Sequence, residues 1–520
     1  MQGKKEYSEK LFLSFQLSQR VPENNFYRRL KSTLDLSFLS KQTKSYYGSE
    51  GQQSIDPEVF FKLMLVGYIE NLGSDRKIIE HASMRLDILF FIGYDLDEEL
   101  PWHSTLSRTR KLYGEDVFLS LFQKVLSLCI AKGMVSGKRQ AIDSAYIKAN
   151  ASLDSLVEKQ VVADTQTFLD ELNENEEDQH IVTEQNKKLV EEHHNWQKEA
   201  YKGMPGHRAN EKPENDEDGN SIRPKYLSNY THYSPTDPDA RISTKPGKPR
   251  QLNYSGQISV DTKSHVICGA MADYADKRDS QSLPAILVNT IDNLKPHDIK
   301  INEVLADTGY SSGTALKALE FQQIIGYIPN FGQYKPTREG FTYDPENDRY
   351  ICSQGAYLPY KKTYADRKGN VKKHYRASSL NCKKCTLRYV CIGKSNEKTI
   401  EDTIDKEYYD RMHERMQTDK ARIMRKLRQS TVEPVLGTLV NFLNMKRVNT
   451  RGIAQANKHV LMAALAYNLK KYMKYATRER NRMIVEVNKA LETAIILPIS
   501  DLFLSLFRFL GISHKILTPN

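Results

Sequence analysis

The stretch EVLADTGYSSG at residues 303–313 passes from a short apolar run directly to an acid. Its residues Val304, Leu305 and Ala306 are typical of the end of a buried strand, and Asp307 follows them at once. A carboxylate at the end of a buried strand loses hydration energy unless another group compensates it. The stretch therefore predicts a strand with a chemically important acid at its end, provided that the chain supplies partners for that acid.

Length and composition limit the class of protein. A chain of 520 residues is too long for one simple core, and 39% hydrophobic residues indicate a rather polar protein of several structural units. The most apolar segment, residues 494–512, contains Pro498, Asp501 and Arg508, so we expect an amphipathic helix there and no membrane span. Neither a signal peptide nor a secreted disulfide scaffold is indicated, so we expect a cytoplasmic protein.

The charge is distributed unevenly along the chain. The net charge is +11, but residues 151–220 hold 18 acids against 7 Lys and Arg. The other 450 residues hold 69 Lys and Arg against 47 acids. A basic body with one acidic segment favours a polyanionic partner, most simply nucleic acid, although an ordinary solvated basic surface would give the same composition.

The first 135 residues are predicted to form a helical domain. Asp56 is a plausible N-cap, Pro57 suits the first helical position, and apolar residues then recur at three- and four-residue spacing up to Gly73. Residues 74–93 repeat the pattern. Short basic helices of this kind fit a DNA-binding module of the helix-turn-helix type, and they fit a dimerisation bundle equally well.

Beyond residue 136 the pattern predicts a mixed α/β domain that extends to residue 450. Strands are expected around Asp143, over residues 250–273, and before Asp307, with helices between the later strands. Asp279 is interpreted as the cap of one of these helices. Residues 155–240 are predicted to interrupt this domain as an acidic helical insertion with a flexible tip over residues 203–222, and residues 340–395 as a cysteine-containing insertion. Residues 451–520 are expected to form a helical tail.

Three acids are candidates for a common site. Asp143 and Asp307 each follow an apolar strand pattern, on the two sides of the acidic insertion. Glu433 is the single acid among residues 420–478, which contain thirteen Lys and Arg. Each acid alone could be a turn, cap or ion-pair residue. Together, carboxylates within a basic region are what a nuclease needs, because Mg²⁺ prefers oxygen ligands and two such ions roughly 3.5–4 Å apart can assist phosphoryl transfer.

The sequence around these acids resembles the bacterial insertion-sequence transposases of the DDE class. The similarity is carried by AIDSAYIKANAS around Asp143, LADTGYSSG around Asp307 and RQSTVEPVLGTLVNF around Glu433. Residues 56–110 are also similar to the N-terminal helical domain of that family. Leu436 stands where relatives have an aromatic residue, and Val440 where some have a lysine.

The resemblance implies an RNase H-like catalytic core of mixed α/β fold. It implies an enzyme that cleaves strands at the ends of its element and joins them to target DNA, with Mg²⁺ or Mn²⁺ held by Asp143, Asp307 and Glu433. The implied partner is double-stranded DNA, as terminal inverted repeats and as target, and the implied state is a homo-oligomer near the bacterial nucleoid, with no membrane contact. An RNase H-like nuclease without strand transfer, and an inactive zinc-containing DNA-binding protein, are the alternatives.

Basic residues near the third acid are expected to bind phosphate groups. Arg422, Arg425 and Arg428 precede Glu433 in the sequence, and we expect them to contact DNA. Arg428 is the nearest arginine upstream of that acid.

A cysteine cluster forms a second group of candidates. Cys382, Cys385 and Cys391 lie in CKKCTLRYVC, and Cys352 lies thirty residues before the first of them. Four thiols with this spacing can hold zinc, and similar transposases carry such a cysteine cluster at this place, although free thiols in a reducing cytosol would look the same. Three basic residues of the cluster would then face DNA: Lys383, Lys384 and Arg388.

Overall fold

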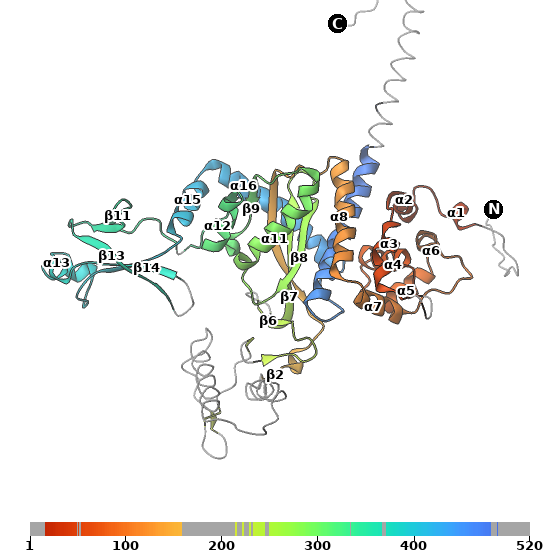
Figure 1. Ribbon diagram of the computed structural model, residues 1–520, viewed down its shortest axis with the longest axis horizontal. Coiled ribbons are helices and arrows are strands. Elements are labelled where there is room, and N and C mark those ends of the chain that lie inside the picture. The colour runs from red at the N-terminus through yellow and green to blue at the C-terminus, as the bar shows by residue number, and fades with distance from the viewer. Residues whose placement is uncertain are drawn as a thin grey trace, which may run out of the picture.

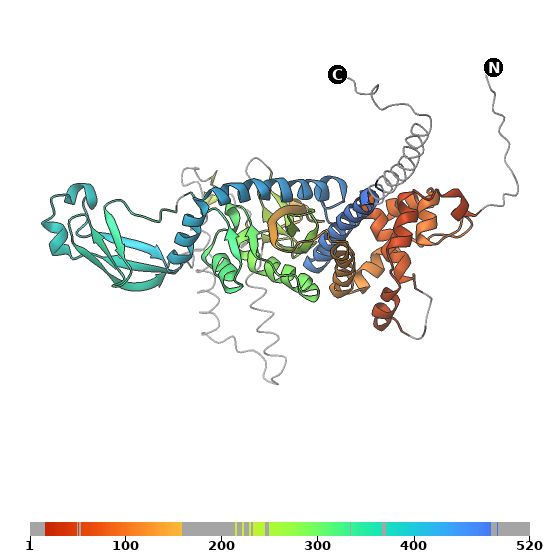
Figure 2. The ribbon, with the colours of Figure 1, turned by 90° about the horizontal axis from the view of Figure 1, so that it is seen from above.

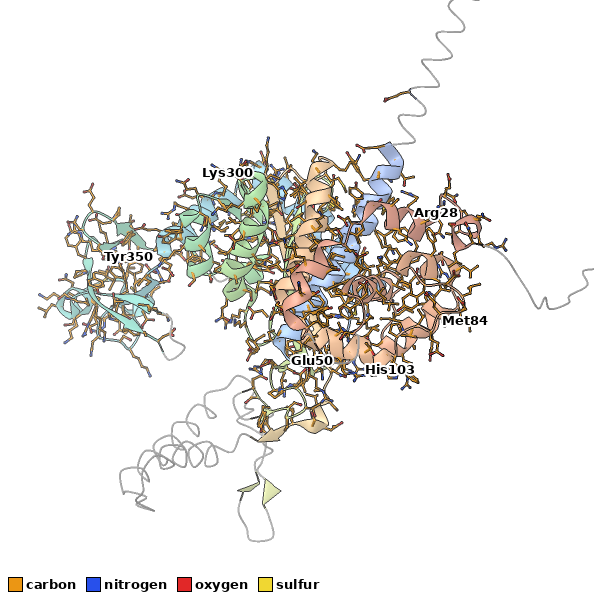
Figure 3. The ribbon with its side chains drawn as sticks, turned by 45° about the vertical axis from the view of Figure 1, so that its right-hand side comes forward. Arg28, Glu50, Met84, His103, Lys300 and Tyr350 are labelled. Atoms are coloured by element: carbon orange, nitrogen blue, oxygen red, sulfur yellow. The ribbon has the colours of Figure 1, made fainter. Side chains whose placement is uncertain are left out.

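The computed structural model describes residues 16–48, 54–158, 228–229, 232–244, 249–332, 334–366 and 371–479, together with a few isolated positions (50, 214–215, 221–222 and 486). The described chain has three parts in a row, as Figure 1 shows. A helical domain lies at one end, a layered α/β unit in the middle, and a small β unit at the other end. Figure 3 places Met84 and His103 on the helical domain, Lys300 on the α/β unit and Tyr350 in the small β unit.

The helical domain is built around one buried helix. Helix α4 (Pro57–Ile69) begins as predicted, because the Asp56 side chain accepts a hydrogen bond from the Glu58 N–H at 2.6 Å. Nine of its thirteen residues are buried, so it is a central helix rather than a surface helix. The surrounding helices are α1 (Leu17–Arg20), α2 (Phe26–Thr33), α3 (Phe38–Thr43), α5 (Asp75–Ser83), α6 (Leu86–Ile92), α7 (His103–Leu112) and α8 (Glu115–Ala131).

The central unit contains a mixed sheet with the strand order β10-β9-β1-β7-β6, and β8 also pairs with β7. The strands are β1 (Arg139–Lys148), β6 (Arg241–Ser243), β7 (Gln251–Asp261), β8 (Ile267–Tyr274), β9 (Glu303–Leu305) and β10 (Ile325–Tyr327). Strand β1 is antiparallel to β7 and parallel to β9, which is in turn parallel to β10. The mixed α/β architecture predicted from the sequence is confirmed.

Helices cover both faces of this sheet. Helix α16 (Asp419–Phe442) runs along one side, and α11 (Asp279–Leu294) and α12 (Gly313–Phe321) lie on the other, as Figure 2 shows. Helix α15 (Lys406–Met416) precedes α16 and leads back from the small β unit. The start of α16 is fixed by Glu303, which pairs with Lys420 and with Arg139 of β1, each at 2.5 Å.

Residues 453–479 form a helix at the centre of the molecule. The apolar run from Val460 to Leu469 is almost entirely buried in the core that the helical domain and the sheet share. The Asn468 side chain bonds both backbone groups of Ile267, and the buried Lys458 ammonium donates to the carbonyl of Tyr113 at 2.6 Å. The sequence predicts a C-terminal tail from residue 451. Residues 453–479 are helical, but the run from Val460 to Leu469 is enclosed in the core instead of forming a tail, because a helix segment that is apolar on all sides must be buried.

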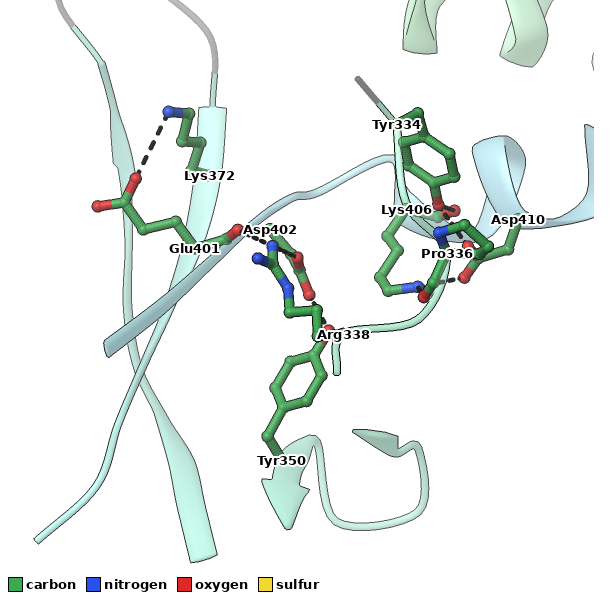
Figure 4. Close-up of polar contacts among 9 residues, drawn as sticks. All are labelled: Tyr334, Pro336, Arg338, Tyr350, Lys372, Glu401, Asp402, Lys406 and Asp410. Carbon is green, nitrogen blue, oxygen red and sulfur yellow. Dashed lines mark hydrogen bonds and ion pairs between the residues drawn. The ribbon is translucent and has the colours of Figure 1, made fainter. Parts of the chain in front are cut away.

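The small β unit is a separate antiparallel sheet. Its strands are β11 (Phe341–Asp344), β12 (Arg349–Cys352), β13 (Tyr357–Ala365), β14 (Val371–Arg376) and β15 (Thr399–Thr403), and two short helices follow β14, namely α13 (Ser379–Lys383) and α14 (Arg388–Cys391). Polar contacts tie it to the segment that precedes it, as Figure 4 shows. Asp402 accepts from Arg338 and Tyr350, and Asp410 of α15 accepts from Lys406 and Tyr334.

Most of the acidic insertion lies outside the described residues, including the predicted tip at residues 203–222 apart from two short strands. The predicted amphipathic helix at residues 494–512 also lies outside the described residues. The described parts include the short pairs β2 (Val157–Glu158) with β5 (His232–Tyr233) and β3 (Glu214–Asn215) with β4 (Ser221–Ile222). Within the described ranges, no helix is long and apolar enough to cross a membrane.

Candidate active site

Asp143 of β1 and Asp307, which follows β9, lie near one another where β9 ends beside β1. Strands β1 and β9 are parallel, and their register pairs Ala141 with Leu305. Asp143 comes two residues after Ala141, and Asp307 comes two residues after Leu305. The parallel pairing therefore brings together two acids that are 164 positions apart in the sequence. Each side chain is held locally, because Asp143 accepts from the Ser144 N–H and Asp307 from the Gly309 N–H, both at 2.8 Å.

Arg428 connects Asp143 to Glu433. Its guanidinium Nη1 lies 2.9 Å from Asp143 Oδ2 and its Nη2 lies 3.2 Å from Glu433 Oε1. The Arg428 and Asp143 side chains are 11% and 16% exposed, whereas that of Glu433 is 54% exposed. Glu433 therefore stands at the solvent edge of the site and Arg428 lies inside it. The sequence predicts Arg428 to be a DNA contact, but here its guanidinium is bound to two carboxylates.

The charges of this site act on one another. Burial raises the pKa of the Asp143 carboxyl above its usual value, and the negative charge of Asp307 raises it further. The Ser144 N–H and the Arg428 guanidinium oppose this increase. Two carboxylates that repel one another in a half-buried place favour a cation between them. Asp143 and Asp307 therefore form a cation-attracting pair, and Arg428 already satisfies one side of it.

Asp279 is a further acid at this site, which sequence reasoning interpreted as a helix cap. The interpretation is wrong, because the N-cap of α11 is Arg278 and Asp279 lies in the first turn. Its Oδ1 accepts hydrogen bonds from Ser144 Oγ at 2.7 Å and from Gln257 Nε2 at 3.1 Å. An acid five residues after β8 was visible in the sequence, but only the tertiary structure shows that it bonds side chains of β1 and β7.

Gly309 separates Asp279 from Asp307. A methyl group placed on Gly309 would lie 3.0 Å from Asp307 Oδ1 and 3.4 Å from Asp279 Oδ2. Both carboxylates therefore border the same small space above the Gly309 backbone. A side chain at this position would occupy it, which gives a steric reason for glycine in the turn.

Tyr310 lies beneath the acids. The residue is completely buried, and its hydroxyl donates to Gln257 Oε1 at 2.6 Å. Burial raises the pKa of Tyr310 well above its usual value, and the charges of Asp279, Asp143 and Asp307 raise it further. Tyr310 therefore remains a neutral hydrogen-bond donor, and its bond fixes the amide of Gln257 so that Nε2 faces Asp279.

The donor atoms of this site suit a hard divalent cation. Carboxylate oxygens are the ligands that Mg²⁺ and Mn²⁺ prefer. Across the described ranges, no three Asp, Glu, His or Cys side chains already stand in a metal-holding arrangement. The residue types at this site therefore fit a metal ion. In this structure the guanidinium of Arg428 pairs with Asp143 and Glu433 and supplies the positive charge there.

The four cysteines lie in the small β unit, away from these acids. Cys352 and Cys382 border its core of Tyr350, Leu358, Tyr375, Ala377 and Ile400, and Cys385 and Cys391 are half-buried in the α13–α14 region. In the part of the chain that is described, no three of them surround one point. Of the three basic residues predicted to face DNA there, Lys383 and Lys384 are exposed and Arg388 is half-buried.

Two family models match the chain. The first, described as a transposase domain (DUF772), covers residues 15–112, and the second, described as a transposase DDE domain, covers residues 351–473. The chain is an insertion-sequence transposase of the DDE class. The first match spans the transposase's helical domain through α7, and the second contains Glu433 and much of the buried helix over residues 453–479. No curated protein matches the chain.

The matches also confirm the predicted type of fold and activity. The mixed sheet agrees with the RNase H-like core predicted for a DDE transposase, and the activity is DNA transposition by polynucleotidyl transfer. The family implies dependence on a divalent metal ion and binding to DNA. Asp143 and Asp307 lie outside both matches, so their roles rest on the geometry described above.

Proposed function

We propose that Asp143, Asp307 and Glu433 form the active site at which this transposase cleaves its element's ends and joins them to target DNA. The observation that carries the proposal is the pair of ion pairs made by Arg428, which joins Asp143 of β1 to Glu433 of α16 across 285 positions of sequence. Asp307 follows the neighbouring strand β9, two residues beyond its end. These contacts support a common site for three acids from three distant segments of the chain.

The chain's own residues position the reacting groups. Asp143 and Asp307 are held by backbone N–H groups, and the hydrogen bond from buried Tyr310 fixes the side chain of Gln257. When bound, Mg²⁺ or Mn²⁺ supplies the activation of water or of a 3′-hydroxyl and the stabilisation of the leaving oxygen. No observation favours a nuclease without strand transfer or an inactive DNA-binding protein. Self-association and association with the nucleoid stay predictions from the family resemblance.

A strand-transfer assay tests the proposal. DNA that carries the inverted repeats flanking the gene is incubated with the full-length protein, a target plasmid and Mg²⁺. We expect nicked ends and a joined product, both lost when the metal ion is chelated. Cleavage without any joined product would support a nuclease instead. Cleavage that persists in a chelator would contradict the metal-dependent site.

One face of α16 is suited to guide DNA to these acids. Positions 422, 425, 426, 429 and 433 recur at three- and four-residue spacing, so they share one side of the helix. All five residues are exposed. Three of them are cations: Arg422, Arg425 and Lys426. The face therefore presents three positive charges in a row that leads to Glu433, whereas Arg428 points inward.

Neutralising this face should weaken DNA binding. Arg422→Gln, Arg425→Gln and Lys426→Gln together should lower affinity and reduce the slope of log affinity against log salt by up to about 2.7, because each phosphate contact contributes about 0.9. Titrations of labelled duplex DNA at several salt concentrations measure this. The matched control neutralises three exposed lysines that are not part of α16, Lys41, Lys295 and Lys300, and should leave the slope unchanged. Equal effects of the two triple variants would contradict the proposed surface.

Zinc binding by the four cysteines stays a prediction from their spacing. Elemental analysis of the purified full-length protein measures it directly. One zinc per chain, lost in a Cys385→Ser variant, would confirm that the thiols rearrange around an ion. Absence of zinc from protein purified without chelator would leave the cysteines as free thiols, as the structure shows them.

A further inference from the structure

Asp279 has one oxygen engaged and the other directed to the proposed active site. Oδ1 accepts from Ser144 and Gln257. Oδ2 borders the space above Gly309 that Asp307 Oδ1 also borders. No hydrogen bond to Oδ2 is found within the described residues. An acid whose second oxygen faces another carboxylate is poorly placed for fold stability alone, because the two negative charges repel one another.

The neighbours of Asp279 orient it toward this space. Ser144 follows Asp143 directly on β1, so its hydroxyl binds Asp279 to the strand that carries Asp143. The buried Tyr310 hydroxyl fixes the amide of Gln257, whose Nε2 then donates to Asp279. Supporting hydrogen bonds of this kind hold the ligands of metal sites in position. Two side-chain hydrogen bonds, from Ser144 and from Gln257, thus hold Asp279 in position.

We propose that Asp279 is a fourth metal-holding carboxylate of this transposase, acting with Asp307 on one divalent ion, directly or through a bound water. The site would then consist of two pairs. Asp143 and Glu433 share Arg428, while Asp307 and Asp279 share the space above Gly309. This inference rests on the proposed function, because it assigns an additional ligand to the same site.

A purely structural role is the alternative to be distinguished. A carboxylate in the first turn of α11 also interacts favourably with the helix dipole, and its bonds to Ser144 and Gln257 connect the helix to the sheet. Asp279→Asn separates the two roles. The asparagine oxygen can still accept both hydrogen bonds, whereas the negative charge and the second acceptor oxygen are lost.

The test is the binding of Mn²⁺ to the full-length protein by isothermal titration calorimetry, without DNA. Asp279→Asn should weaken the binding about 10- to 100-fold, as expected for loss of a supporting or water-mediated ligand. The matched control is Asp276→Asn on the same connection, whose exposed side chain lies 3.5 Å from Arg241 and should not affect Mn²⁺. Ser144→Ala keeps every carboxylate but removes the hydroxyl that orients Asp279, and should weaken binding severalfold.

The outcomes separate this inference from the proposed function. If Asp307→Asn weakens Mn²⁺ binding while Asp279→Asn and Ser144→Ala leave it unchanged, Asp279 is structural and the inference is wrong, but the site stands. If Asp307→Asn also binds Mn²⁺ normally, the proposed site itself is wrong. Should Asp279→Asn fail to fold, as judged by its melting transition, Ser144→Ala decides, because a structural role predicts reduced stability with unchanged Mn²⁺ affinity.

Discussion

Replacing Asp307 by asparagine is expected to lower strand cleavage at least about 1,000-fold while the protein stays folded. A metal ion contributes several kcal/mol of transition-state stabilisation, and about 4 kcal/mol corresponds to three orders of magnitude in rate. The asparagine oxygen can still accept the Gly309 N–H that Asp307 binds, so the turn should persist. The change removes the negative charge of Asp307 and therefore one carboxylate ligand of the metal ion.

Cleavage of end-containing DNA, followed on denaturing gels, measures this effect. Asp292→Asn is the matched control, because Asp292 is exposed on α11 and lies outside the site. The control should cleave at the wild-type rate. Retention of more than about a tenth of wild-type activity in Asp307→Asn, with the control normal, would remove Asp307 from the catalytic site.

The sequence predicts the candidate acids because local patterns mark them. Asp143 and Asp307 follow apolar strand patterns, and Glu433 is isolated among basic residues. Strand β1 and the helix α4 with its Asp56 cap were predictable for the same reason, since their signals lie within a few residues. The sequence alone does not show that the acids meet. That depends on the parallel register of β1 with β9 and on the packing of α16 over β1.

What sequence reasoning missed depends on long-range contacts. In the sequence Arg428 cannot be distinguished from the exposed basic residues Arg422 and Arg425. Its position on α16, however, directs its side chain inward to Asp143. Asp279 has the sequence of a helix cap, and its partners Ser144 and Gln257 come from two other strands. The buried helix over residues 453–479 is different, because its continuous apolar run was a sufficient signal for burial.

Replacing Arg428 by glutamine is expected to destabilise the metal-free protein by about 3 kcal/mol at pH 7. The side chains of Arg428 and Asp143 are 11% and 16% exposed, and removing one partner of a buried ion pair leaves the other charge uncompensated, which costs about 3–5 kcal/mol. We choose the lower end because Glu433, the second partner, is 54% exposed and can be solvated. Urea unfolding in the presence of a chelator measures the loss.

The loss should depend on pH in a defined direction. Burial raises the pKa of Asp143 in the folded protein, so the native state holds a proton that the unfolded state has released between about pH 4 and the folded pKa. The contribution of Asp143 to stability therefore falls as pH rises through this window. Without Arg428 the folded pKa rises further and the window widens upward. Arg428→Gln should thus be nearly neutral at pH 4 and most destabilising at pH 7.

Mg²⁺ should offset this loss, because a bound cation compensates the same carboxylates that Arg428 pairs with. Millimolar Mg²⁺ is expected to raise the stability of Arg428→Gln at pH 7 by more than it raises that of the wild-type protein, in which the arginine competes for Asp143. Arg422→Gln is the control, since the exposed ion pair of Arg422 with Asp419 contributes at most about 1 kcal/mol and lies outside the site. An equal response to Mg²⁺ in all three proteins would mean that Arg428 and the metal ion do not share these ligands.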